Sequence, residues 1–193
     1  MKDRIIHGAD ADSAPPRNDL KIIFSKEIME KYIPAWKKIN APQGLKYLAL
    51  IMAQMEGFTS TSRSFRTNNP GNIGNTDNGG NSTFPTLISG IDAQIKYLMR
   101  VAMGKNKNYP LGKEVFLKPY FSPEIARNQK KYKLDPYCDG FTFVYTGELR
   151  QFIKIYSTGA RQKNTYLSVI ISYYKNLGIT ITERTMLSEL MNR

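Results

Sequence analysis

Residues that build disulfide and metal sites are almost absent from this sequence. Among 193 residues there is one cysteine, Cys138, and one histidine, His7. A single cysteine excludes an intramolecular disulfide, and one cysteine and one histidine far apart in the chain do not supply a zinc site. A nucleophile activated by histidine would depend on His7, in a polar N-terminal segment. No EF-hand spacing of carboxylates is found, and we predict no metal and no other cofactor.

Long apolar runs are also absent. No stretch approaches the 18 consecutive apolar residues of a transmembrane helix, so we expect no membrane insertion. The first residues, "MKDRIIHGADADSAPPRNDL", lack the apolar core of a secretory signal peptide. A protein of this kind that acts outside the cytoplasm needs another route of release. The hydrophobic share of 41% nevertheless suits a folded globular protein.

Acidic residues are few relative to basic ones, and the formal net charge is +12. This excess predicts an anionic partner such as nucleic acid, a membrane surface or the bacterial cell wall. It is most pronounced over residues 105–133, where the basic residues are Lys105, Lys107, Lys113, Lys118, Arg127, Lys130, Lys131 and Lys133. A solvated basic face explains any single one of these residues more simply. Aromatic residues are interleaved with them, as in proteins that stack bases, but no nucleic-acid-binding signature accompanies them.

The chain is predicted to consist of an arm and one domain. Residues 1–19 are polar and contain the break "SAPPRND", which indicates a flexible N-terminal arm. Residues 20–193 are expected to form a single, mainly α domain with little or no β-structure, because helical periodicity dominates and no internal repeat is found.

Local patterns predict where the helices lie. They are expected over 25–40, 43–57, 89–103, 146–157, 161–179 and 182–193, with shorter helices near 111–118 and 122–131. Ser25 is the expected N-cap of the first helix, which Pro34 ends or restarts. Ser89 and Asp92 resemble a capping box for the helix over 89–103. The segment 104–147 is ambiguous, because prolines interrupt it repeatedly.

One acidic residue stands out at the end of the helix over 43–57. Glu56 follows Met52 by four residues, so it lies on the edge of the apolar face, and Gly57 marks the helix end. Partial burial disfavours the charged form of a carboxyl group, which can then keep its proton near neutral pH and donate it. Cleavage of a glycosidic bond requires such a donor. From the helix alone, an ordinary surface glutamate is the better explanation, since a negative charge at a helix C-terminus is only mildly unfavourable.

The loop that follows is rich in asparagine and glycine. In "NNPGNIG", residues 68–74, asparagine and glycine accept left-handed backbone conformations and Pro70 fixes a turn. Amide side chains and free backbone groups supply the directional hydrogen bonds by which sugars are recognised. A tight connection between two helices explains the same composition.

Several short motifs occur in a characteristic order along the chain. They are "AQMEGFTSTS", "TNNPGNIG", "FPTLISGIDAQIKYL" and "IYSTGARQKNTYLSVIISYY". This order resembles the bacterial endo-β-N-acetylglucosaminidases of the autolysin and flagellar-muramidase type, and "NNPGNI" resembles phage endolysins and virion-associated lysozymes. The resemblance implies a lysozyme-like helical fold and hydrolysis of peptidoglycan. It assigns the catalytic acid to Glu56 and the active-site tyrosine to Tyr156. Substrate contacts would come from Phe58, Asn68, Asn69, Asn72 and Ile73.

The sequence identifies the second catalytic group less clearly than the first. Two carboxylates are usual in glycosidases, and Asp77, in the same loop, is the nearest candidate. Lytic transglycosylases of the same fold use a single glutamate, and in some glycosidases the N-acetyl group of the substrate assists. In either case Tyr156 could stabilise developing charge or orient the acetamido group. A core tyrosine with its hydroxyl at the edge is the simpler explanation without the resemblance.

We therefore predict a phage or virion-associated lysin that cleaves peptidoglycan. It would be released to the cell wall from the host cytoplasm or carried in a particle with other virion proteins. The alternatives are a lytic transglycosylase, and a basic virion protein with no catalytic activity that has a structural role or binds nucleic acid.

Overall fold

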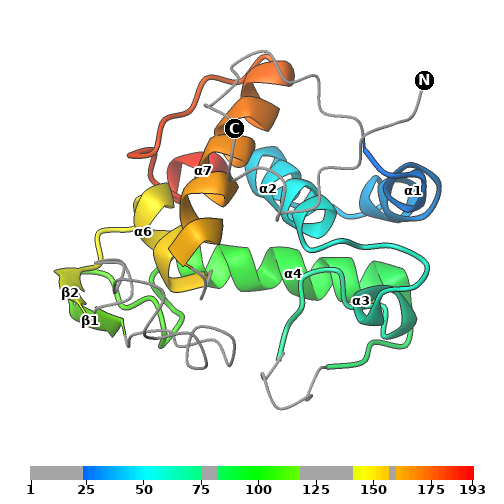
Figure 1. Cartoon of the computed structure of the whole chain (residues 1–193), viewed down its shortest axis with the longest axis horizontal. Coiled ribbons are helices and arrows are strands. Elements are labelled where there is room, and N and C mark those ends of the chain that lie inside the picture. The colour runs from blue at the N-terminus through cyan, green and yellow to red at the C-terminus, as the bar shows by residue number, and fades with distance from the viewer. Residues whose placement is uncertain (1–23, 75–81, 118–140, 157–159) are drawn as a thin grey trace, which may run out of the picture.

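The computed structural model describes residues 24–74, 82–117, 141–156 and 160–193, which form a mainly helical structure with one small sheet (Figure 1). The elements are η2 (Ile28–Tyr32), α1 (Ile33–Trp36), α2 (Gln43–Met55), α3 (Arg63–Arg66), α4 (Leu87–Ala102), β1 (Glu114–Leu117), β2 (Phe141–Val144), α6 (Leu149–Tyr156), α7 (Ala160–Asn176) and η3 (Glu189–Met191). The prediction of a mainly α protein is confirmed. The predicted arm, residues 1–19, lies outside the described residues. No helix in the described ranges combines the length and apolar character needed to cross a membrane.

Helix α2 is the centre of the core. It packs against α1, α4, α7 and η3 (Figure 1). Leu45, Leu48, Ile51 and Met52 are among its buried side chains. A helix that is apolar on most of its circumference is stable in water only when other helices surround it, so the sequence of α2 explains its central place. Its last turn is thereby held inside the molecule.

The first helical segment changes geometry at Pro34. The side chain of Ser25 accepts a hydrogen bond from the N–H of Ile28 at 3.3 Å, as expected of an N-cap. The N–H of Ile33 donates to the carbonyl of Ile28, five residues back, which is the pattern of a π-helix. Pro34, which has no N–H to donate, then lies in the first turn of α1. The helix restarts at this proline, as one of the two predicted alternatives requires.

Helix α4 begins two residues before the predicted start. Thr86 and Ser89 form its capping box: the side chain of each accepts a hydrogen bond from the backbone N–H of the other. The predicted pair, Ser89 with Asp92, was therefore wrong by one turn. Asp92 instead forms an ion pair with Lys96 at 2.6 Å, four residues along the same helix.

The segment predicted as a helix over 111–118 contains a strand instead. β1 pairs antiparallel with β2, with Glu114 opposite Val144 and Leu117 opposite Phe141. Both strands are rich in β-branched and aromatic residues, which favour a pleated surface, but β2 lies too far along the chain for a local pattern to reveal the pairing. The helix predicted near 122–131 falls outside the described residues. The predicted tail helix is reduced to the single turn η3.

Candidate active site

Glu56 stands at the C-cap of α2, where the chain leaves the helix in a Schellman motif. The N–H of Gly57 donates to the carbonyl of Gln54 at 3.2 Å, and the N–H of Phe58 donates to that of Ala53 at 3.1 Å. Gly57 has φ +66°, a left-handed conformation that glycine adopts without strain. This motif fixes the backbone of Glu56 at the point where the buried helix ends.

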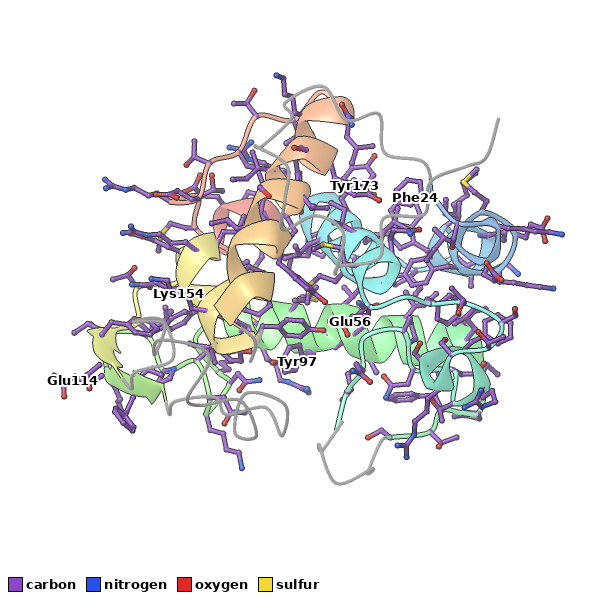
Figure 2. The ribbon with its side chains drawn as sticks, viewed as in Figure 1. Phe24, Glu56, Tyr97, Glu114, Lys154 and Tyr173 are labelled. Atoms are coloured by element: carbon purple, nitrogen blue, oxygen red, sulfur yellow. The ribbon has the colours of Figure 1, made fainter. Side chains whose placement is uncertain are left out.

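The carboxyl group of Glu56 is held by a tyrosine from α7. Tyr166 donates its hydroxyl to Oε1 of Glu56 at 2.7 Å, across 110 residues of sequence. A negative charge at a helix C-terminus costs about 0.3–1 kcal/mol, whereas a hydrogen bond to a charged acceptor contributes about 1.5–3 kcal/mol. The hydrogen bond is therefore the larger effect, and it accounts for the carboxyl group being directed towards α7. Glu56 is partly buried and lies near the middle of the molecule (Figure 2).

Tyr156, the predicted active-site tyrosine, lies next to this pair. It is the last residue of α6, and its ring centroid is 6.4 Å from that of Tyr166. Burial raises the pKa of both hydroxyls, and the nearby negative charge of Glu56 raises the pKa of each further. Both tyrosines therefore stay protonated and remain hydrogen-bond donors at physiological pH. The structure thus brings together two of the three residues predicted to be catalytic, Glu56 and Tyr156.

The two tyrosines belong to a larger set of packed tyrosines, here called the tyrosine cluster: Tyr97, Tyr109, Tyr145, Tyr156 and Tyr166. Tyr97 on α4 donates its hydroxyl to that of Tyr109 at 3.0 Å. The ring of Phe152 connects Tyr109 to Tyr156, with centroid distances of 5.4 and 5.7 Å. The cluster supports Tyr156 and Tyr166, the two members that lie beside Glu56, because large packed rings keep fixed orientations.

The asparagine-rich loop is held by one of its own side chains. The buried amide of Asn69 donates to the carbonyls of Ile73 and Ser82 at 2.8 and 2.9 Å, and it accepts from the N–H of Ile73 at 2.9 Å. Asn68 and Asn72 both have φ +52°, as expected of turn residues that tolerate the left-handed region. These hydrogen bonds therefore hold the loop in one defined backbone conformation.

Helix α4 connects this loop to α2. A Cβ atom added at Gly90 would lie 1.7 Å from the carbonyl oxygen of Asn68, and one added at Gly71 would lie 2.5 Å from Cγ of Gln94. Buried Gln94 in turn donates to the carbonyl of Ala49 on α2 at 3.0 Å. The loop and the helix that ends at Glu56 are thus both fixed to one face of α4.

The other residues predicted for the site differ in how far they are buried. Phe58, predicted to contact substrate, is a core residue with 1% exposure, packed against the rings of Tyr32 and Phe65. The reason is the Schellman motif, which turns the residue after Gly57 back onto its own helix. Both amide hydrogens of Asn69 serve the loop itself. Asn68, Asn72 and Ile73 are partly exposed. Asp77 lies outside the described residues.

Two residues of the site were not predicted, Tyr166 and Gln94. Tyr166 lies on α7, 110 residues from Glu56, and nothing in the sequence pattern of α7 identifies Glu56 as its partner. Gln94 lies on the apolar face of α4, where a buried amide is unusual enough to indicate an internal hydrogen-bond network. It accepts from the hydroxyl of Tyr32 at 3.0 Å, which completes that network.

No second carboxylate in the described ranges is bonded to Glu56. Six other acidic groups in these ranges have partners elsewhere: Asp92 with Lys96, Glu148 and Glu183 with Arg150, Glu30 with Lys26, Glu189 with Arg193, and Glu27 with the N–H of Ser60. Glu114 is exposed on the small sheet, well away from Glu56 (Figure 2). Within the same ranges, no three acidic, histidine or cysteine side chains are grouped so that they could hold a metal ion.

Comparisons of the chain with models of protein families, with curated proteins and with solved structures find no match. The lysozyme-like fold and the family resemblance therefore stay predictions.

Proposed function

We propose that this protein is a peptidoglycan-cleaving glycosidase with a lysozyme-like fold, in which Glu56 is the general acid. The observation that carries the proposal is the partly buried carboxyl group at the end of α2, bonded to Tyr166 at 2.7 Å and adjacent to Tyr156. A carboxyl group in such surroundings can donate a proton to the oxygen of a leaving sugar.

The neighbouring groups have roles consistent with this chemistry. The hydroxyl of Tyr156 would stabilise charge that develops on the sugar or orient its N-acetyl group. Asn68, Asn72 and Ile73 would supply loop contacts to the glycan, while Asn69 would keep the loop in shape. The net charge of +12 favours association with a cell wall that bears anionic polymers. A phage or virion-associated origin rests on the motif resemblance alone.

A lytic transglycosylase is the second candidate, and one observation favours it. The side chains described beside Glu56 are tyrosines, and not the second carboxylate that hydrolysis usually employs. In the transglycosylase reaction one glutamate first gives a proton to the leaving oxygen and then removes one from the sugar's own hydroxyl. The product carries an anhydro ring instead of a new reducing end.

Replacement of Glu56 tests the proposed acid directly. We expect Glu56→Gln to lower the rate of clearing of purified peptidoglycan by about 10²–10⁴-fold, because the amide has no proton to donate at neutral pH. Glu114→Gln is the matched control, since it makes the same change at an exposed position. Equal thermal unfolding of the two variants shows that the loss is chemical.

Mass spectrometry of the released muropeptides identifies the reaction. New N-acetylglucosamine or N-acetylmuramic acid reducing ends indicate hydrolysis and show which bond is cut, whereas anhydro sugars indicate transglycosylation. Wild-type protein that leaves purified walls of several bacteria intact would contradict the proposed function and favour a structural or nucleic-acid-binding role.

A further inference from the structure

The hydrogen bond to Glu56 engages only one of its two carboxyl oxygens. Tyr166 donates to Oε1 at 2.7 Å. Among the described residues, no other hydrogen bond to this carboxyl group is found. An unrestrained glutamate side chain samples several rotamers and can present either oxygen. A single bond from a fixed donor removes that freedom and makes the two oxygens different.

We propose that Tyr166 is a positioning residue that fixes Oε1 of Glu56, so that Oε2 carries the proton transferred to the substrate. This inference rests on the proposed function, and it assigns to Tyr166 a role that the motif resemblance did not include. Correct placement of a reacting group contributes strongly to catalysis, and a displacement of about 1 Å can cost about 10²-fold in rate.

The surroundings of Tyr166 suit this role. Its ring lies beside that of Tyr156, and α7, which carries it, packs against both α2 and α6. Burial and the charge of Glu56 both raise the pKa of the Tyr166 hydroxyl, which therefore remains a donor wherever the enzyme is folded. Among the residues that the structure describes, the titratable group beside the pair is Tyr156 on α6, whose own hydroxyl is affected by Tyr97 on α4 and by Tyr109.

Removal of one hydroxyl tests the inference. In Tyr166→Phe we expect kcat on soluble peptidoglycan fragments to fall by about 10–100-fold with KM nearly unchanged. A residue that only positions the acid affects the chemical step and leaves substrate binding intact, so the separation of kcat from KM is the diagnostic result. Tyr173→Phe is the matched control, because Tyr173 lies on the same helix and packs against Phe24, away from Glu56 (Figure 2).

The outcomes distinguish failure of the inference from failure of the proposed function. Loss of activity in Glu56→Gln, with unchanged kcat in Tyr166→Phe, overturns the inference and leaves the proposed function standing. An equal fall in kcat in Tyr166→Phe and Tyr173→Phe also overturns the inference, because general loosening of α7 would explain that result. Equal activity of wild type and Glu56→Gln overturns the proposed function and the inference together.

Discussion

Two adjacent asparagines in the loop over residues 68–74 have different environments. Asn69 is fully buried and bonds three backbone groups, from Ile73 and Ser82. Asn68 is partly exposed and makes one side-chain bond, to the carbonyl of Phe84 at 3.0 Å. The buried amide replaces the secondary structure that the loop lacks, because buried backbone groups require partners. Asn69 therefore stabilises the loop from inside, whereas Asn68 lies partly at its surface.

Replacement of Asn69 should unfold this loop before it affects any chemistry. We expect Asn69→Ala to lower the free energy of unfolding by about 2–4 kcal/mol, because each buried backbone group left without a partner costs about 1–3 kcal/mol. Denaturant unfolding followed by circular dichroism measures the change. Asn192→Ala, at an exposed position near the C-terminus, is the control and should change stability by less than about 0.5 kcal/mol. Equal midpoints for the two variants would contradict the structural role of Asn69.

At the scale of elements, α4 is the platform on which the site is built. Gly90, Gln94 and Tyr97 recur at spacings of four and three residues, so they share one face of the helix. Gly90 lies against Asn68 of the loop, Gln94 bonds the backbone of α2, and Tyr97 begins the tyrosine cluster. The loop, the acid-bearing helix and the tyrosines therefore keep fixed relative positions because all three contact α4.

Gly90→Ala tests the contact between α4 and the loop. Alanine in a helix interior is ordinarily more stable than glycine by about 0.5–1 kcal/mol. Here its Cβ would meet the backbone oxygen of Asn68, and we expect a net destabilisation of about 1–3 kcal/mol with displacement of the loop. Asp92→Ala on the same helix removes only an exposed ion pair, which is worth about 0.3–0.5 kcal/mol. Thermal unfolding compares the two, and a stabilised Gly90→Ala variant would show that the contact is unimportant.

Across the whole molecule, buried and half-buried tyrosines join the helices. Burial is the principal cause of a raised pKa at eight of them: Tyr32, Tyr97, Tyr109, Tyr145, Tyr156, Tyr166, Tyr173 and Tyr174. In the unfolded chain each would ionise with a pKa of about 10. The folded state therefore binds more protons than the unfolded state above that pH, and its stability falls as the pH rises.

Alkaline conditions should consequently unfold the protein cooperatively. Each of these tyrosines loses its proton more readily in the unfolded chain, so each lowers the free energy of unfolding as the pH rises above about 10. Phenolate absorbance and helical circular dichroism, recorded from pH 9 to pH 12, should therefore change together. Ionisation of most tyrosines near pH 10 with unchanged helical signal would show that their burial is not maintained in solution.

Features that depend on residues close together in the chain could be predicted from the sequence. The apolar spacing of α2 and the glycine after it predicted a helix that ends on Glu56, and periodicity also identified α4, α6 and α7, because each pattern is contained within one element. Contacts between distant parts of the chain became known only from the folded structure: Tyr166 with Glu56, β1 with β2, Gly90 with Asn68, and Phe58 with the core. These contacts join residues that packing brings together, and no local pattern encodes which partner a side chain will reach.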